Sequence, residues 1–493
     1  MSKAGDRSRR DAATARTFGP ASESPQASVK LVASLVPQLP AFLSRQGWRF
    51  HEEQPRAGGA TMRSEDRSPQ QSQPSATSAN VLHIEVLLPG RPGLLAASFT
   101  MDGVVHQLLL GLRRPGRGLI KVLGGSGDAV VGVVEDDAGE AVAYDALVDP
   151  VLCRQILKVA CDPVVLRAHG LELDGDQAGS NQEIKVRLAR TRGSSVVVFD
   201  EKVMLKVYHR LSGGSHRDAE MIVALDRVGF NHIAAPVAVW RIDGVDRGIV
   251  QESSGLGTEG LALAVTSLRD LYDSKCAPGA AGGDFAAESE RLGVMTGRMH
   301  VALADAFGAS AGAPAEWASS IERAMRSASS RGSRSVKRRS AAELLDRLRA
   351  VERPGMSIRV HGAYSLGNVA RTEVGWLVSE LEPLDGEPQW SARAGGGESA
   401  GRRYGSSGGM PSPVSSPIYD VATMFRSFAA VARAAADEHD PSGWADLAPF
   451  ARAWRSRNSR AFLAGYMSAS GVEGLLPAER DVFDLVLRAM MLA

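Results

Sequence analysis

The chain has 493 residues, with 57 Lys and Arg against 56 Asp and Glu, and its hydrophobic content is 44%. This length predicts two or three domains, and the apolar content is sufficient to bury their cores. The balanced charge favours neither nucleic acid nor an anionic membrane surface as a partner. No apolar run approaches the roughly 18 residues of a membrane helix. Cys153, Cys161 and Cys276 lack metal-ligand spacing, which indicates a reducing, cytoplasmic setting.

The N-terminal third is predicted to be a disordered tail followed by a β-rich domain. Residues 1–29 are rich in Ser, Arg, Ala and Pro, and no secretory apolar segment follows their basic side chains. The domain covers residues 30–182. It opens with the apolar spacing of a short helix over 31–48, followed by a polar loop over 52–79. From Val81, short apolar runs bounded by Gly and Pro predict an antiparallel sheet.

Near the end of the N-terminal domain, a helix is predicted to start after Asp149, which caps it. Residues 183–262 are then predicted to form a small β-rich lobe. The apolar runs over 194–208 surround an Asp-Glu-Lys turn and predict a hairpin. A second hairpin turns at Asp243, since an Asp-Gly pair between apolar runs favours a tight turn. Between the two hairpins, a helix is expected to stop at Gly229.

Residues 263–493 are predicted to form a helical lobe, interrupted by a mobile loop over 390–416 that is full of Gly, Ser and Arg. A helix begins cleanly after that loop, with Ser416 as a cap, Pro417 at the first position and Asp420 in the first turn. Strands that precede helices in this way predict an α+β chain with two lobes and a cleft between them.

Two groups of residues in the small lobe could bind a nucleotide. Lys206 ends a β-branched strand and Glu220 lies on the helix that follows. Kinase-type folds hold the α and β phosphates of ATP with a strand lysine whose direction a helix glutamate fixes. Upstream, Ser194 and Ser195 stand at a Gly-Ser turn whose backbone N–H groups can meet phosphate. The alternative is an exposed lysine, a solvated glutamate and an ordinary turn.

Gln251 and Glu252 close the small lobe, where a linker to the helical lobe is expected. In kinase-type folds the backbone of this linker hydrogen-bonds the adenine ring. An ordinary strand end explains the same residues equally well, so both interpretations stay open.

The segment "VHGAYSLGNV", residues 360–369, resembles a phosphotransferase loop that lacks its central carboxylate. Phosphoryl transfer needs a group that orients or deprotonates the acceptor hydroxyl, and oxygen ligands for Mg²⁺. His361 would set the loop and Asn368 offers an amide oxygen to the metal. The position between them that usually carries the carboxylate is Ala363.

Glu380 and Glu382 form a carboxylate pair with strand-like spacing, which places both side chains on one face. Together with Asn368 they could complete a metal site built from oxygen ligands. The alternative is a pair of solvated carboxylates on an edge strand.

Taken together, these segments resemble the maltokinase family, a branch of the aminoglycoside-phosphotransferase-like kinases with its own N-terminal cap domain. The resemblance runs from about Leu39 to the C-terminus and rests on an ordered set of segments: "LPAFLSRQGW", "VAYDALVDP", "SSVVVFDEKVMLKVYHRL", "LALAVTSLRDLY", "LGVMTGRMHVALA" and "SPIYDVATMFRSF". It implies an ATP- and Mg²⁺-dependent kinase that makes maltose 1-phosphate in trehalose and α-glucan (glycogen) metabolism, often beside trehalose synthase. Lys206 and Glu220 then match the family's nucleotide-binding pair.

Departures from the family pattern fall at the reaction centre. Ala363 stands where the family has its catalytic Asp, Ser365 replaces the following His, and Asn368 replaces a Gln. Glu380 replaces the metal-binding Asp, while Glu382 is retained. The phosphate loop has also changed, because its Asn-Thr-Ser is here the tripeptide over 193–195.

A second alignment is open, in which Asp385 takes the place of Glu380 as the metal ligand. We prefer Glu380 because "ELE" keeps the spacing of the two carboxylates.

Catalysis is expected to be impaired, since a positioned general base is worth about 10²–10⁴-fold in rate. The resulting pseudokinase would be a binding or regulatory module of the same pathway. The alternative is an active kinase on maltose or another sugar, with a rearranged site that uses Glu382, Asp385 or Ser365. A third option is an amino sugar or aminoglycoside as acceptor.

Overall fold

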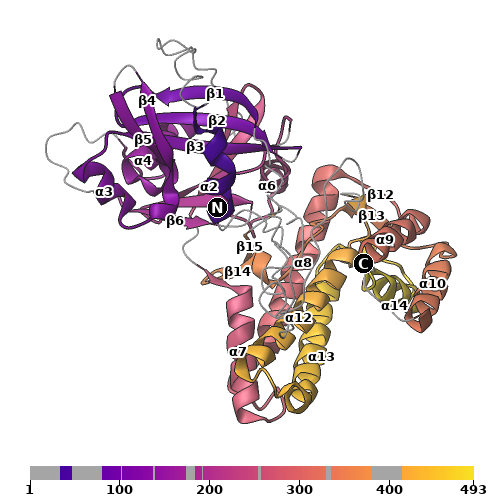
Figure 1. Ribbon diagram of the computed structural model, residues 1–493. Coiled ribbons are helices and arrows are strands. Elements are labelled where there is room, and N and C mark those ends of the chain that lie inside the picture. The colour runs from indigo at the N-terminus through magenta and orange to yellow at the C-terminus, as the bar shows by residue number, and fades with distance from the viewer. Residues whose placement is uncertain are drawn as a thin grey trace, which may run out of the picture. The chain divides into compact units, whose positions relative to one another are not determined.

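The computed structural model describes residues 34–46, 80–101, 103–136, 139–173, 184–190, 193–211, 213–253, 257–328, 335–379, 381 and 414–493. The predicted tail 1–29, the polar loop 52–79 and most of the stretch 390–416 lie outside this part. The described residues fall into two compact units (Figure 1). Those of unit 1 lie in Met1–Ala219 and Pro236–Ser253, and those of unit 2 lie in Glu220–Ala235, Ser254–Gly396 and Ser406–Ala493.

Unit 1 contains two five-stranded antiparallel sheets and a few short helices. The first sheet has the order β1-β2-β3-β5-β4, and the second has the order β6-β7-β8-β10-β9. Its strands are β1 Asn80–Leu88, β2 Gly93–Met101, β3 Val104–Arg113, β4 Val130–Asp136, β5 Gly139–Asp145, β6 Val186–Arg190, β7 Ser194–Phe199, β8 Val203–Tyr208, β9 Pro236–Ile242 and β10 Val245–Glu252. Its helices are η1 Val36–Gln38, α2 Leu39–Arg45, α3 Arg117–Leu123, η2 Gly127–Ala129, η3 Ala146–Val148, α4 Pro150–Ala160 and α5 Pro163–Ala168, and α6 Arg217–Arg227 begins in this unit.

The central strands β2 and β3 of the first sheet are buried on both faces. Leu39, Phe42 and Leu43 of α2 cover one face. The other face shares a cluster of apolar side chains with α4 and with the second sheet, and this cluster includes Ile156 and Leu205. Double coverage explains why β2 and β3 read as almost continuous apolar runs without the alternation of a half-exposed strand.

Two turns of unit 1 follow the prediction. Asp200 and Glu201 join β7 to β8 with φ of 50° and 55°, and Asp243 joins β9 to β10 with φ of 48°. Positive φ at such positions suits Asp and Gly and matches the twist of hairpin strands. Asp149 caps α4 as expected, because its carboxylate accepts the N–H of Val151 at 2.9 Å.

Unit 2 is mostly helical and carries two small three-stranded sheets, of order β11-β14-β15 and β12-β13-β16. Its helices after α6 are α7 Gly260–Ser274, α8 Ala286–Phe307, α9 Pro314–Ala328, α10 Ser335–Arg349, η4 Leu366–Asn368, α12 Ile418–His439, α13 Trp444–Ser468, η5 Val472–Leu475 and α14 Arg480–Met490. Its strands are β11 Thr258–Glu259, β12 Ala309–Ala311, β13 Met356–Arg359, β14 Val369–Thr372, β15 Gly375–Val378 and β16 Val414–Ser415.

Helices α8 and α13 approach closely in the core of unit 2 (Figure 1). A methyl group at Gly293 of α8 would meet the carbonyl oxygen of Phe462, and one at Gly465 of α13 would meet that of Glu290. Because only glycine leaves this space, the two backbones can lie against each other. This contact places His300 of α8 beside Tyr466 of α13.

The predicted α+β class, with antiparallel strands first and helices afterwards, is confirmed. Ser416 contributes to the start of α12, since its hydroxyl accepts the N–H of Ile418 at 3.3 Å. The predicted domain boundaries near residues 183 and 263 stay predictions. None of the helices in the described part of the chain has both the length and the hydropathy needed to cross a membrane.

Candidate functional site

The strand lysine singled out in the sequence lies in a buried polar cluster of unit 1. Lys206 Nζ is 3.0 Å from Asp218 Oδ2, and the two side chains are 5% and 0% exposed. The Tyr208 hydroxyl donates to the same oxygen at 3.0 Å. Asp218 stands in the first turn of α6, where the helix dipole favours a carboxylate. The structure therefore gives Lys206 a carboxylate partner that the sequence analysis did not identify.

The four nucleotide candidates on β7 and β10 lie on two different faces of the second sheet. Directly paired residues share a face, and Ser194 pairs with Tyr208 while Gln251 pairs with Met204. Since Met204, Lys206 and Tyr208 alternate along β8, Ser194 and Gln251 lie on the face of Lys206. This face also carries the half-buried apolar side chains of Val196 and Met204.

Ser195 and Glu252 lie on the opposite face. The Ser195 hydroxyl is buried and hydrogen-bonded to His209 Nε2 at 2.9 Å. Glu252 Oε1 lies 3.3 Å from His169 Nδ1. Any contact of these two residues with a nucleotide would use their backbone, as the sequence analysis assumed for the linker.

Glu220 belongs to unit 2 by its contacts, where Arg359 donates to Glu220 Oε2 at 2.6 Å. Arg359 closes β13, the strand that leads into the loop of residues 360–369, and its guanidinium lies 4.3 Å from the ring centroid of Phe307. Glu220 is 46% exposed. Its predicted pairing with Lys206 stays a prediction.

The loop of residues 360–369 is held by one buried carboxylate, that of Asp420 on α12. Its Oδ2 accepts the N–H of His361 at 2.8 Å, and its Oδ1 accepts the N–H of Gly362 at 2.9 Å. Gly362 has φ of 88°, a conformation that only glycine adopts without strain, so the turn requires this residue. Asp420 thus acts as a clamp on the loop backbone, beyond any interaction with the dipole of its own helix.

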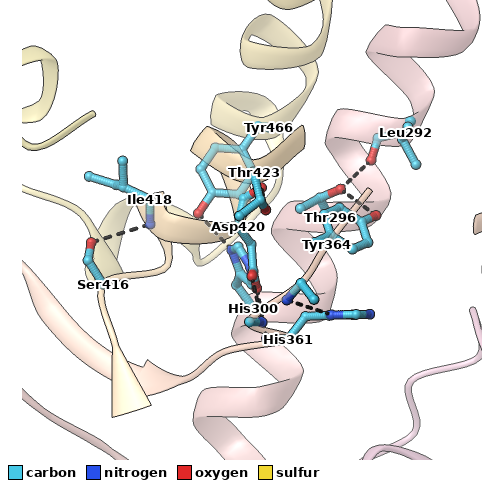
Figure 2. A network of polar contacts seen from close by, with 12 residues as sticks. Leu292, Thr296, His300, His361, Tyr364, Ser416, Ile418, Asp420, Thr423 and Tyr466 are labelled. Atoms are coloured by element: carbon cyan, nitrogen blue, oxygen red, sulfur yellow. Dashed lines mark hydrogen bonds and ion pairs between the residues drawn. The ribbon is translucent and has the colours of Figure 1, made fainter. Parts of the chain in front are cut away.

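A third donor to Asp420 comes from helix α8 (Figure 2). His300 Nε2 lies 3.1 Å from Asp420 Oδ2, and its Nδ1 lies 2.9 Å from the Tyr466 hydroxyl. Burial raises the pKa of the Tyr466 hydroxyl, so this group keeps its proton. Because a carboxylate oxygen only accepts hydrogen bonds, His300 Nε2 carries a proton and donates it to Asp420.

The electrostatics of Asp420 follow from these donors. Burial by itself raises the pKa of its carboxyl, but the hydrogen bond from His300 and the N–H of Gly362 outweigh burial and hold that pKa below its ordinary value. Asp420 is therefore an ionised carboxylate with no exposed surface. Its three hydrogen-bond donors make it a scaffold group.

The reacting end of the loop carries no carboxylate at position 363, where the half-buried Ala363 follows Gly362. The backbone N–H of Ala363 donates to His361 Nδ1 at 3.3 Å, which shapes the turn. Ser365 donates its hydroxyl to Asn368 Oδ1 at 2.7 Å. The amide oxygen that the sequence analysis offered to Mg²⁺ is thus already engaged by one donor, and it retains one lone pair.

Tyr364 connects the loop to helix α8. Its hydroxyl is 3.0 Å from Thr296 Oγ1, which in turn donates to the carbonyl of Leu292 (Figure 2). Burial raises the pKa of the Tyr364 hydroxyl, so it keeps its proton and donates a hydrogen bond inside the fold.

The metal site predicted from the sequence cannot be placed, because Glu380, Glu382 and the alternative Asp385 lie outside the described residues. Within the described ranges, no cluster of three or more His, Cys, Asp or Glu side chains could hold a metal ion. Asn368 is the one predicted metal ligand whose surroundings are defined.

Sequence reasoning missed Asp218, His300 and Tyr466 as members of these centres. Asp218 carries a signal in retrospect, since it stands in the first turn of the same helix as Glu220. For His300 the available signal was a histidine among the apolar positions of a helix, which more often marks an ordinary core residue. Tyr466 lies 166 positions away from His300, and no local pattern connects the two.

No protein-family model matches the chain. Among solved structures, the chain is similar to a glucosamine kinase in complex with glucosamine, ADP and inorganic phosphate, at 18% identity and a TM-score of 0.49 over 86% of this chain and 89% of that one. It is also similar to a putative aminoglycoside phosphotransferase from Ralstonia eutropha, at 14% identity and a TM-score of 0.28 over 62% of this chain and 97% of that one. A choline kinase from Cryptosporidium parvum matches at 10% identity and a TM-score of 0.22, over 66% of this chain and 92% of that one. Likeness at this level concerns the fold alone.

Proposed function

We propose that the protein is a maltokinase-like, ATP-dependent sugar phosphotransferase homologue in which phosphoryl transfer is impaired. One observation carries the proposal: the loop of residues 360–369 keeps its buried clamp, Asp420, while position 363 offers only a methyl group. The loop is therefore built to present a group at position 363, and that group cannot accept a proton.

Three neighbouring groups do not take over the role of base. Asp420 is fully buried and accepts three hydrogen bonds, so it cannot reach an acceptor hydroxyl. The buried Tyr364 keeps its proton, because burial raises the pKa of its hydroxyl. The hydroxyl of Ser365 is a poor base and already donates to Asn368. Together these facts favour impaired transfer over a rearranged active site.

The nucleotide part of the proposal rests on Lys206 and its sheet face. Lys206 would hold phosphate oxygens, with Ser194 and Gln251 on the same face and Glu220 as a further candidate. ATP would supply the phosphoryl group, with Mg²⁺ neutralising its charge. Asn368 fits an oxygen ligand for Mg²⁺, with Glu380 and Glu382 as the proposed carboxylate ligands. The family reaction would place the protein in trehalose and α-glucan metabolism, with maltose as its sugar and trehalose synthase as an associate.

The experiment is a transfer assay with ATP and Mg²⁺ on the unmodified chain, on Ala363→Asp and on Ala363→Asn. Maltose and glucosamine serve as the two acceptors, so a neutral and an amino sugar are compared. We expect Ala363→Asp to transfer phosphate about 10²–10⁴-fold faster than the unmodified chain, which is the typical contribution of a positioned base. Ala363→Asn has a similar size without the basic oxygen and should gain nothing.

Two results would contradict the proposal. Turnover by the unmodified chain at ordinary kinase rates, about 1–100 per second, would show that a rearranged site is active. Absence of any thermal stabilisation by ATP and Mg²⁺ would remove the nucleotide part.

A further inference from the structure

We infer that Asp218 is the positioning residue that sets Lys206 for nucleotide phosphates. This inference rests on the nucleotide binding proposed above and adds a residue to it. The starting observation is the 3.0 Å contact between Lys206 Nζ and Asp218 Oδ2, both of which are shielded from water. A charge pair interacts far more strongly in such surroundings than at the surface, because water does not screen it.

Asp218 is itself held in place by a frame of contacts. Tyr208 donates its hydroxyl to the carboxylate oxygen that faces Lys206. The backbone N–H of Asp218 donates to His216 Nδ1 at 3.3 Å, and the His216 ring stacks on the Tyr208 ring with centroids 3.6 Å apart. The carboxylate therefore has one defined position in space.

The frame continues to a second buried carboxylate. The N–H of His216 donates to Asp246 Oδ2 at 2.8 Å, and Arg241 Nε donates to Asp246 Oδ1 at 2.6 Å. Asp246 thus fixes the segment before α6, on which Asp218 depends. The matched control for the loss of a buried carboxylate is Asp149, which lies outside this frame, is 0% exposed and has its own arginine partner at 2.8 Å.

A fixed carboxylate matters because a lysine side chain is long and flexible. An ammonium already held at one point loses less conformational freedom when phosphate arrives, and such preorganisation strengthens binding. Glu220, the carboxylate that the sequence suggested for this task, is 46% exposed and accepts from Arg359. Water screens an exposed carboxylate, so we expect Asp218 to contribute more than Glu220 does.

The test compares the binding of ATP with that of adenosine, which lacks phosphates. Dissociation constants are measured by calorimetry on the full chain, with Mg²⁺, for the unmodified protein, Asp218→Asn, Lys206→Met, the double variant and Asp149→Asn. We expect Asp218→Asn to weaken ATP binding about tenfold or more, in the range of a lost charged hydrogen bond, while adenosine binding changes less than about twofold.

The double variant and the control separate positioning from mere stability. If Asp218 acts through Lys206, Asp218→Asn adds no further loss in the Lys206→Met background. Asp149→Asn should leave the ratio of ATP to adenosine affinity unchanged, because this carboxylate touches no member of the frame. Should Asp218→Asn not fold, Tyr208→Phe removes one contact of the frame and is expected to weaken ATP binding about threefold, again sparing adenosine.

Three results overturn the inference alone, provided that the unmodified chain binds ATP. These are unchanged or tighter ATP binding by Asp218→Asn, equal weakening of ATP and adenosine, and full additivity in the double variant. Tighter binding would mean that Asp218 competes with phosphate for Lys206. Absence of ATP binding by the unmodified chain would instead contradict the proposed function, and this inference with it.

Discussion

Two buried aspartates organise the two units in different ways. Asp218 in unit 1 faces a cation, Lys206, at 3.0 Å. Asp420 in unit 2 faces the backbone N–H groups of His361 and Gly362 and the ring of His300. Both carboxylates are fully buried, so both must be matched by donors.

The two aspartates therefore differ in what their partners can still do. A cation held by Asp218 can still meet phosphate from another side, whereas the donors of Asp420 are all consumed inside the fold. Under the proposed function, the methyl group at position 363 takes the place of a reacting group without disturbing the clamp on the loop. Such a chain would keep nucleotide recognition and loop geometry while phosphoryl transfer is slow.

The largest expected effect comes from Asp420→Ala. Removal of this carboxylate leaves a buried histidine and two backbone N–H groups without their acceptor, and breaking a buried pair costs about 3–5 kcal/mol of unfolding free energy. Hydrogen exchange of the amides at His361 and Gly362 should accelerate, which mass spectrometry of the loop peptide would detect. Unchanged exchange at both amides would refute the clamp.

The contact between α8 and α13 offers a second way to break the Asp420 centre. Gly293→Ala forces a methyl group against the carbonyl of Phe462, and overpacking of this kind costs about 1–3 kcal/mol. Gly118→Ala in α3 is the matched control, because a methyl group there meets no atom within 4 Å. That control should be neutral or stabilise by about 0.4–1 kcal/mol. Equal effects of both substitutions in thermal unfolding would contradict the packing argument.

The pH dependence of stability should differ between the unmodified chain and Asp420→Asn. The folded-state pKa of Asp420 is lowered, so its carboxylate stabilises the fold above the unfolded-state pKa of about 3.9 and loses this contribution as the pH falls below that value. We expect the unmodified chain to lose more stability than Asp420→Asn between about pH 5 and about pH 3. Parallel pH profiles of the two proteins in chemical denaturation would refute this assignment.

The smallest expected effect comes from Glu220, a half-exposed carboxylate that contrasts with the two buried aspartates. Glu220→Gln breaks the ion pair with Arg359, and a half-exposed pair contributes about 0–1 kcal/mol. Thermal unfolding of this variant should therefore stay close to that of the unmodified chain. A loss as large as that of Asp420→Ala would mean that Glu220 has a structural role comparable to the buried carboxylates.

Local patterns predicted much of the fold. The hairpin turns at Asp200 and Asp243, the cap at Asp149 and the helix after Ser416 were all predicted from residues a few positions apart. Helices α3, α5 and α9 and the hairpin of β14 and β15 were not predicted. α3, α5 and the hairpin are short, so they carry too few periodic positions to stand out, and their stability comes from packing. The 15-residue α9 does have amphipathic spacing, which was overlooked.

The candidate site residues also differ in whether a local pattern or the packing of distant segments reveals them. Lys206, His361 and Asn368 were found because they belong to short motifs. Asp218 was overlooked in favour of Glu220, although both stand on the same helix. Residues two apart on a helix point in different directions, so which carboxylate meets Lys206 depends on how the helix is rotated against the sheet.

The sequence by itself determined which groups the loop can and cannot offer, because the side chain at position 363 is a methyl group whatever the fold does. Only the tertiary structure decided which groups hold the loop and the lysine. Asp420 lies 58 positions from Gly362, and His300 lies 120 positions from Asp420. Buried charges find their partners through packing across such distances, since each must be matched once water has been excluded.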